Sequence, residues 1–522
     1  AQDKWTVSDK LNLTLGLRID VPFFMTDLQS NDKVAAETYR DGIKIDVSKY
    51  PNAKPQFSPR FGFNYKPFDD ENGSLQIRGG TGLFTGTPPY VWISNQAGNN
   101  GVLFGDLNVR AVKDKNDNII SDGRPSLGFT GNMDTYKPAE GSATRSDIAI
   151  TDPDFKYPSL WKSNIAADYK FGDGWVATVE LLYSKDINAI YHDNIGLYRT
   201  EQFVNDGGAG NARPYYNGYY SDREGNQKAA NHVVMLRNTS KGHSLYTTFQ
   251  LQKNFVDGIL KGLYLNGSYS FGQSRGVTDG TSSVATSAWK YRAALDGNAE
   301  EVGYTAGSFD GRLLLSASYT ANWSKYAATS FGLIYQRYRP FRYSYCYNGD
   351  ANGDSQFSND LMYIPANFDE VKDHLLPGDF DSQEDAWKAM NAFIEQDPYL
   401  SKHRGEYAER NGAVAPFANQ LDLSVSHDIK IYQKNGRSHT LRFSFNIANF
   451  LNLLNRNWGV VQTTVLGNQQ YQFLTIPKGQ GPSAANNYTL KYTMAKDLDE
   501  TFKDNLNDVS RWQMQFLSLI HI

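Results

Sequence analysis

The chain has 522 residues and a net charge of −4. A charge this close to zero gives no electrostatic reason to expect nucleic acid as a partner, and a single cysteine, Cys346, excludes an internal disulfide framework and a cysteine-based zinc site. The mean hydropathy is −0.55, and no apolar run reaches the roughly 18–20 residues of a membrane-spanning helix, which excludes a helical membrane protein.

Pairs of strands with alternating apolar and polar residues recur along the chain, and a tight turn joins the two strands of each pair. In the first pair, residues 1–7 and 11–21, every second residue from Leu11 to Ile19 is apolar. Successive side chains of a strand point to opposite faces, so such a strand has one apolar and one polar face. Further pairs are predicted at residues 57–67 and 74–85, 160–170 and 175–191, 244–255 and 263–275, 309–323 and 326–346, and 418–431 and 440–451, with weaker strands at 488–494 and 511–516.

Long segments connect one strand pair to the next. Loops of such length are uncommon in a compact soluble domain, whereas transmembrane β-barrels combine short turns at one end with long loops at the other. The chain is also rich in tyrosine, which suits the interface between membrane and water. The sequence therefore predicts an all-β fold, an antiparallel transmembrane β-barrel of about fourteen strands with long extracellular loops. The predicted loops are residues 23–56, 87–159, 192–242, 276–307, 347–416 and 452–486.

A soluble β-sandwich or β-propeller is the alternative fold. Sandwich strands also alternate, but their connections are shorter and more even than those of this chain. A propeller has a repeat of about 40–50 residues, and the sequence shows no such repeat.

One long loop, residues 347–416, is predicted to be partly helical. Within it, residues 381–395 carry Trp387, Met390, Phe393 and Ile394 at helical spacing, after a cap at Asp381 or Ser382. We expect this apolar stripe to pack the loop on itself rather than to bind a ligand.

The same loop contains Asp350, Asn352 and Asp354 at alternate positions. Oxygen ligands spaced in this way resemble the start of a calcium-binding loop, because a hard cation needs several oxygens from one tight turn. Ser355 stands where an EF-hand has glycine, and Leu361 stands where it has glutamate. The sequence thus predicts a looser structural Ca²⁺ site, with an Asp/Asn-rich turn as the alternative. The residues that could complete the site are Gln356, Ser358 and Asp360, and a weaker copy of the spacing is formed by Asp114, Asn116 and Asn118.

Two aromatic segments are candidates for ligand binding. Exposed aromatic rings beside polar groups suit recognition of sugars or peptides, although such rings also pack loops or line a membrane interface. The first segment contributes Arg213, Tyr215, Tyr216, Tyr219 and Tyr220, near Arg223, and the second, after two prolines, contributes Tyr90 and Trp92.

Catalytic motifs are missing from the sequence. The eight histidines are scattered, and neither H-E-x-x-H nor G-x-S-x-G occurs. No catalytic residue is assigned, and the chain is not expected to be an enzyme or to require a cofactor other than the Ca²⁺ ion. Charged residues on the polar strand faces could line a pore or form ion pairs inside a barrel, and they are Arg18, Asp20, Arg78, Arg312, Asp422 and Arg442.

Several segments, in their order along the chain, resemble the TonB-dependent outer-membrane receptors. Residues 5–18 resemble a strand pair of these barrels, and residues 57–65 with 77–84 resemble the next hairpin. The more particular segments are similar to the Oar-like branch, which is common in Bacteroidetes. They are Asn-Asp-Leu-Met-Tyr-Ile-Pro at 359–365, His-Arg-Gly at 403–405, Glu-Arg-Asn-Gly at 409–412, and residues 445–455 with Trp-Gly at 458–459.

The resemblance implies a barrel of about 22 strands in the bacterial outer membrane, with an N-terminal plug domain and a TonB box ahead of it. Neither part is recognisable here, so residues 1–522 are expected to be a single barrel domain, the C-terminal part of a longer receptor. The implied partners are outer-membrane lipid, the TonB complex through the absent N-terminal region, and an unknown extracellular ligand. The implied function is energised uptake of that ligand. A barrel-anchored adhesion protein or a passive pore is the alternative, and an outer-membrane hydrolase is a third.

The last residues depart from the family pattern of an amphipathic terminal strand. Trp512, Met514 and Phe516 share one face, but Leu517 and Leu519 fall on the polar face. Residues 517–522 resemble translated sequencing-adapter sequence and are expected to be non-native.

Overall fold

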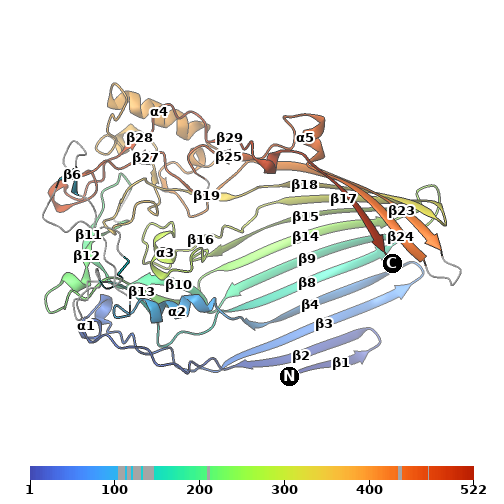
Figure 1. Ribbon diagram of the computed structural model, residues 1–522, viewed down its shortest axis with the longest axis horizontal. Helices are drawn as coiled ribbons and strands as arrows, with labels where there is room; N and C mark the ends of the chain where they lie inside the picture. Colours follow the sequence, from blue (N-terminus) through green and yellow to red (C-terminus); the bar gives the residue numbers. More distant parts are fainter. Residues whose placement is uncertain are drawn as a thin grey trace.

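The computed structural model describes residues 1–103, 112–113, 119–120, 131–132, 134, 146–208, 212–432, 438–467 and 469–521. Its main feature is a 14-stranded sheet whose neighbouring strands are all antiparallel and follow one another in chain order (Figure 1). The two-residue β16 (Gly303–Tyr304) pairs with the end of β15. In sheet order the others are β1 (Gln2–Ser8), β2 (Leu11–Asp20), β3 (Gln56–Asp70), β4 (Gly73–Thr85), β8 (Ser159–Phe171), β9 (Trp175–Asp186), β14 (His243–Asn254), β15 (Leu263–Gly276), β17 (Arg312–Ser324), β18 (Ala327–Tyr338), β23 (Ala418–Tyr432), β24 (Ser438–Ala448) and β30 (Gln513–His521).

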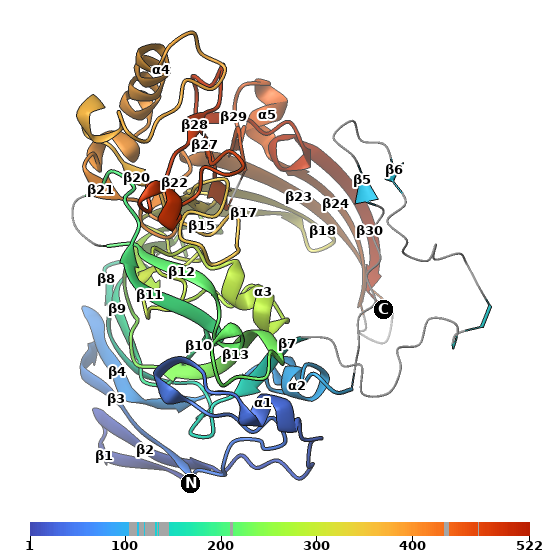
Figure 2. The same cartoon turned by 90° about the vertical axis from the view of Figure 1, so that its left-hand side faces the viewer.

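The tight turns lie at one end of the strands and the long segments at the other, which we call the loop end (Figure 1). Seen from the loop end, the strands follow an arc around the folded loops (Figure 2). This arrangement confirms the predicted all-β, antiparallel architecture of paired strands separated by long connections. The alternation of short turns with long connections differs from the short and even connections of a β-sandwich.

The two faces of the sheet differ as the alternation predicts. In β2, Leu15, Leu17 and Ile19 are each about half exposed, and in β14 Phe249 and Leu251 are as well. A continuous exposed apolar face of this kind fits contact with lipid. On the polar face, by contrast, Arg and Asp side chains form ion pairs between or along strands, including Arg18 with Asp20, Arg78 with Asp168, and Arg442 with Asp428.

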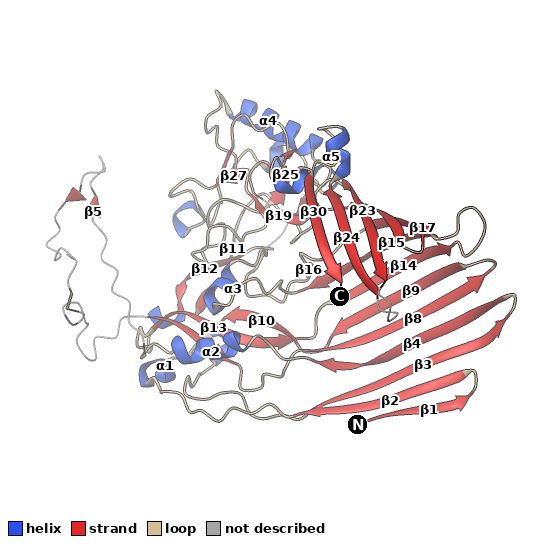
Figure 3. Cartoon of the chain, turned by 45° about the vertical axis from the view of Figure 1, so that its right-hand side comes forward, coloured by secondary structure: helices blue, strands red, loops and turns tan. Residues whose placement is uncertain are grey.

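The loops are folded, and the figures show their helices gathered at the loop end (Figure 3). Among the described residues, no helix is long and apolar enough to cross a membrane. The helices are α1 (Asp32–Ala36), α2 (Tyr90–Gly98), α3 (Ala285–Lys290), α4 (Gln383–Gln396) and α5 (Phe450–Leu454), with 3₁₀ turns η1 (Arg40–Gly42), η3 (Tyr220–Asp222), η4 (Phe368–Glu370), η5 (Leu400–Lys402), η6 (Ala484–Asn486) and η7 (Asp508–Ser510).

Short strands form small sheets among the loops, and most of the described ones pair antiparallel; β13 with β7 and β19 with β26 are parallel. The groups are β7 (Ser146–Thr151) with β13 (Ala230–Thr239) and β10 (Ala189–Asn194); β11 (Leu197–Phe203) with β12 (Pro214–Tyr219); β22 (Ala413–Val414) and β26 (Gln470–Tyr471) with β19 (Arg342–Tyr345); β20 (Tyr363–Ile364) with β21 (Glu406–Tyr407); β25 (Gln462–Thr464) with β29 (Phe502–Asp504); β27 (Leu474–Thr475) with β28 (Thr493–Met494); and β5 (Val112–Lys113) with β6 (Ile119–Ile120).

The buried apolar core lies in these loops. Its largest cluster includes Tyr345, Phe393, Tyr471 and Phe473, from segments far apart in the chain. Helix α4 contributes Met390, Phe393 and Ile394 to this cluster, and Ser382 caps it by accepting a hydrogen bond from the N–H of Asp385. The helix and the packing of its apolar stripe are therefore confirmed. We call the folded loops together the loop assembly.

Three predicted strands differ in the structure. The predicted strand 488–494 is shortened to β28, which pairs with β27 in a loop sheet, and positive φ angles at Asn487 and Tyr488 interrupt the extended backbone at its start. The predicted strand 326–346 ends as β18 before Pro340, which has no N–H to give a neighbouring strand, and continues as β19 in a loop sheet. Similarly, residues 175–191 divide into β9 and β10.

Contacts between remote segments hold the loop assembly together. The segment that follows β11 meets the one before β28, where Asn205 N–H donates to the carbonyl of Tyr488 (3.0 Å) and Leu490 N–H to the carbonyl of Asn205 (2.8 Å). Asn205 and Thr489 form a parallel bridge although they are 284 residues apart.

Candidate functional site

The residues between β19 and β20, 346–362, form a tight loop that we call the aspartate loop. Asp350 accepts hydrogen bonds from the N–H of Gly353 (2.6 Å) and of Ser355 (2.8 Å), and Asp354 accepts one from the N–H of Gln356 (2.8 Å). Aspartate side chains fold turns in this way. Gly353 has a φ of +83°, a conformation that favours glycine.

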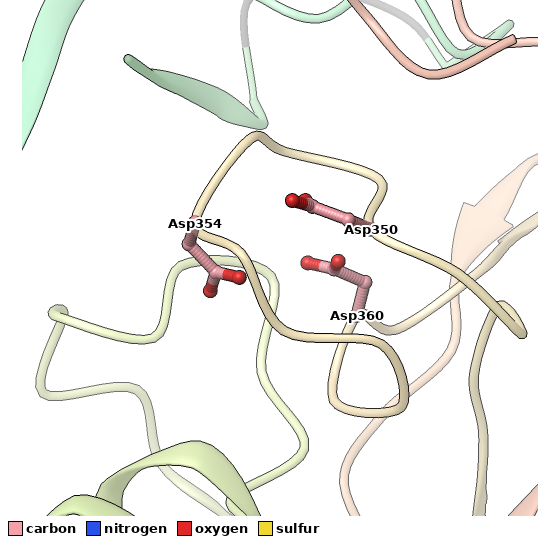
Figure 4. Close-up of side chains that lie close together, drawn as sticks. All are labelled: Asp350, Asp354 and Asp360. Carbon is pink, nitrogen blue, oxygen red and sulfur yellow. The ribbon is translucent and has the colours of Figure 1, made fainter. Parts of the chain in front are cut away.

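Three carboxylates of this loop face one another (Figure 4). One oxygen each of Asp350, Asp354 and Asp360 can be chosen so that all lie within 4.8 Å of one another. Asp354 and Asp360 are fully buried. Burial raises the pKa of Asp354 to about 7, with a further contribution from the charge of Asp350, and burial also raises the pKa of Asp360 and Asp350.

The predicted metal ligands are thus brought together in part. Asp350 and Asp354 belong to the carboxylate group, whereas Asn352 lies beside it, with its Oδ1 accepting from the N–H of Asp354 (2.9 Å). Asp360 is the one of the three additional candidates that joins the group. Asp114, Asn116 and Asn118, the weaker copy of the spacing, lie outside the described residues.

Arg213 joins the aspartate loop to the hairpin of β11 and β12. Its Nε lies 2.9 Å from Asp206 and its Nη1 lies 3.1 Å from Asp360, and it also donates to the carbonyl of Leu361. Burial by itself lowers the pKa of Arg213, but the charges of Asp206 and Asp360 outweigh burial and raise it. The guanidinium is completely buried, so its positive charge interacts with carboxylates inside the loop assembly and not with solvent.

The predicted tyrosines lie around the same loop. Tyr216 is buried, its N–H donates to the carbonyl of Asn352 (2.8 Å), and its hydroxyl donates to Asp296 (2.7 Å). Tyr215 is half-buried, and its ring centroid lies 5.0 Å from that of Tyr488.

Tyr219 and Tyr220 end the same hairpin and pack in different directions. The ring of Tyr219 meets His232 edge-on at 5.2 Å, and the ring of Tyr220 meets Tyr198 edge-on at 5.3 Å. The guanidinium of Arg223 stacks on Tyr198, 3.8 Å from the ring centroid.

A polar cleft of about 560 Å³ opens beside Tyr216 and Tyr220. Arg40 lies in it with its Nη2 2.5 Å from the buried Asp193, and Arg199 lies 3.4 Å from Asp296. Three separate segments, 23–56, 192–242 and 276–307, supply the walls. The cleft is lined by Arg40, Asp41, Arg199, Thr200, Glu201, Phe203, Tyr216, Tyr220, Asp296, Asn298 and Ala299.

Sequence reasoning missed most of the cleft. Arg40, Arg199 and Asp296 belong to no local motif, and they meet only because three loops fold together. The cluster of tyrosines was the one local signal that pointed here.

The second aromatic segment lies elsewhere in the loops. Tyr90 is exposed and lines a pocket of about 290 Å³ that also contains Arg18, Asp20 and Tyr157. Trp92 is not among the residues that line that pocket; its Nε1 donates to the carbonyl of Ser282 (2.8 Å), and its ring lies edge-on to His192 at 5.5 Å. The structure therefore separates Tyr90 from Trp92.

Comparison with known proteins places the chain in a family. A family described as an outer membrane beta barrel domain matches residues 1–481. The chain belongs to this family. The barrel domain is therefore an all-β protein of the bacterial outer membrane, as its strand pattern predicted. No curated protein matches the chain.

Solved structures similar to the barrel domain include two receptors and a transporter. The ferric enterobactin receptor PfeA of Pseudomonas aeruginosa is 10% identical over 86% of this chain and 38% of its own, with a TM-score of 0.37. The siderophore receptor PirA of Acinetobacter baumannii is 8% identical over 86% and 41%, with a TM-score of 0.39. The copper transporter OprC is 9% identical over 99% and 47%, with a TM-score of 0.38. The barrel domain spans less than half the length of each of these proteins.

Proposed function

We propose that the barrel domain is part of a TonB-dependent receptor of the Oar-like branch, which captures an extracellular ligand with its loops and takes it up with energy from the TonB complex. The family assignment supports the outer-membrane barrel. The observation that carries the ligand-binding part is the polar cleft, because three loops converge to build it. On this proposal, a plug and a TonB box belong to the same receptor.

The chemistry of the cleft suits a ligand that carries a positive and a negative group, such as a peptide. The guanidinium of Arg40 already forms an ion pair with Asp193. Arg199 is half exposed, and its contact with Asp296 is long at 3.4 Å, so its guanidinium is accessible to a carboxylate. Asp41 is exposed at the same cleft and can meet an amino group. Charged groups at such a site contribute specificity through complementary placement.

Binding to the purified receptor tests the cleft. We expect peptides from a defined mixture to bind, and Arg199→Ala to weaken binding about tenfold, equivalent to roughly 1.4 kcal/mol. Lys372→Ala, at an exposed lysine whose ion pair is with Asp369, is the matched control and should leave affinity unchanged. Equal affinity of wild type and Arg199→Ala would contradict a role for the cleft.

Uptake tests the energy coupling. Labelled peptide is expected to enter cells that make the receptor and TonB, and to remain outside cells that lack TonB. Entry without TonB would favour the passive pore instead. Surface binding without entry in either strain would favour an adhesion protein anchored by a barrel.

A further inference from the structure

We propose that Asp350, Asp354 and Asp360 together bind one calcium ion, with the side-chain amide of Asn359 as a fourth ligand. The first argument is distance. Oxygens that bind one Ca²⁺ at roughly 2.3–2.6 Å lie no more than about 5 Å apart. The three carboxylates already present oxygens within 4.8 Å of one another (Figure 4), so one ion can contact all three without a change in the backbone.

The second argument is charge. Asp354 and Asp360 are fully buried, and Asp206, which shares Arg213 with Asp360, is buried as well. Among the described residues, Arg213 is the cation that forms ion pairs with these buried aspartates, and its partners are Asp206 and Asp360. Asp350 and Asp354 therefore have no cationic partner among the described residues. Buried carboxylates are costly unless a counter-charge accompanies them.

The third argument is independent of the acidic residues. Asn359 is 2% exposed, and its Nδ2 lies 3.4 Å from Oδ2 of Asp354. Its Oδ1 is buried and has no hydrogen-bond partner, which is uncommon for a buried acceptor. A half turn of the amide about the Cβ–Cγ bond exchanges the two ends and directs Oδ1 toward Asp354. A cation beside Asp354 would satisfy this oxygen.

The type of ligand selects the ion. The proposed ligands are oxygens of three carboxylates and one amide, and hard oxygen ligands suit calcium or magnesium rather than zinc or copper. Magnesium keeps several water molecules and seldom binds in a site built entirely from protein groups. A buried site with three carboxylates therefore favours calcium.

The position of the site gives the ion a role. Arg213 and the N–H of Tyr216 tie the aspartate loop to the β11–β12 hairpin, and Tyr216 lines the polar cleft. A calcium ion that fixes the aspartate loop would also fix this wall of the cleft. The binding site itself does not depend on the proposed transport function, and its test needs no transported ligand.

Calorimetric titration of the detergent-purified protein, after removal of divalent ions with EDTA, tests the proposal. We expect one Ca²⁺ to bind per chain and Asp354→Asn to lower the affinity about tenfold or more, because one of three anionic ligands is lost. Asp369→Asn is the control, since Asp369 is exposed in the neighbouring segment, and it should bind Ca²⁺ like the wild type. No Ca²⁺ binding to the wild type, or Mg²⁺ binding as tight as Ca²⁺ binding, would overturn the assignment.

Thermal unfolding gives a second readout that does not require tight binding. In EDTA, Asp354→Asn should unfold at a higher temperature than the wild type, because one buried charge is gone. In Ca²⁺ the order should reverse, since the wild type gains stability from the ion and the variant gains less. Equal stabilisation of both proteins by Ca²⁺ would overturn the proposal. Asn359→Ala, which keeps all three carboxylates, should show a smaller Ca²⁺-induced shift, measured from its own EDTA curve, than the wild type shows from its own.

Discussion

The guanidinium of Arg213 and the carboxylate of Asp360 form a buried ion pair, with Nη1 3.1 Å from Oδ1, between residues 147 positions apart in the chain. Since Arg213 also pairs with Asp206, one cation holds two carboxylates and joins two loops. Removing one partner of a buried ion pair is far more costly than replacing both, because the other charge remains buried alone.

Arg213→Met is accordingly expected to lower the free energy of unfolding of the loop assembly by about 3–5 kcal/mol. Denaturant titration in detergent, followed by tryptophan fluorescence, measures this loss. Arg456→Met is the matched control, because Arg456 is exposed, and it should change stability by no more than about 0.5 kcal/mol. Similar losses in both variants would show that the buried pair has no special role.

Phe249→Arg, on the apolar face and near the midpoint of β14, is expected to destabilise the barrel by about 2–4 kcal/mol, the cost of a cation that faces the middle of the bilayer. The charged side chain would face lipid, whereas in Gln250→Arg it would face the polar side of the sheet. The folded fraction in lipid vesicles, measured over a denaturant series, compares the two. A larger loss for Gln250→Arg would reverse our assignment of the faces.

Gly353→Ala is expected to disturb the aspartate loop, because a Cβ at this position would lie 2.2 Å from the carbonyl oxygen of Tyr216. Gly225→Ala is a matched control, since Gly225 has a similar φ of +86° but nothing within 4 Å of its added Cβ. The control should cost only the conformational penalty of about 1–2 kcal/mol, and Gly353→Ala should cost more. Thermal unfolding of both variants gives the comparison, and equal losses would contradict the steric argument.

A pH dependence is expected from His192, in β10. Burial lowers the pKa of its imidazole from about 6.5 to about 4, and the charge of Arg292 acts in the same direction. Between pH 6.5 and pH 4 the unfolded chain therefore binds the proton more readily than the folded chain does. The contribution of neutral His192 to the free energy of unfolding is fully present above pH 6.5 and is lost as the pH falls toward 4. The loss is about 3 kcal/mol across this window.

The variant His192→Phe isolates this effect. Phenylalanine keeps an aromatic contact with Trp92 but cannot bind a proton, so its free energy of unfolding should fall less between pH 6.5 and pH 4 than that of the wild type. Subtracting the two curves removes the contribution of carboxylates common to both proteins. Parallel curves would mean that His192 is not the titrating group.

The strands were predictable from the sequence because their two faces meet different surroundings. The alternation of apolar and polar residues in β2 from Leu11 to Ile19 indicates which face of the strand is apolar. The short turns indicate which strands are neighbours in the sheet. The helix α4 was predictable for the same reason, since its apolar stripe has helical spacing. The strand predicted at 488–494 was right only for its end, β28 (Thr493–Met494), because local hydrophobicity does not reveal the positive φ angles at Asn487 and Tyr488 that interrupt its start.

The candidate sites were only partly predictable. Asp350 and Asp354 lie four residues apart, so their shared turn is visible in the sequence, and Asp360 was one of three alternatives. The meeting of Arg40, Arg199 and Asp296 depends on the packing of three loops, and no local pattern encodes it. The buried state of Arg213 likewise follows from partners in other segments.

The bridge between Asn205 and Thr489 has a consequence for how the folded protein assembles. Each hairpin of the sheet joins strands that are neighbours in the chain, but this bridge joins segments that are 284 residues apart. The loop assembly is therefore complete only when the segment after β11 and the segment before β28 have both taken their places. Until these remote segments meet, each loop lacks its partner, so a protease added during refolding should cut the loops before the bridge forms and spare them afterwards.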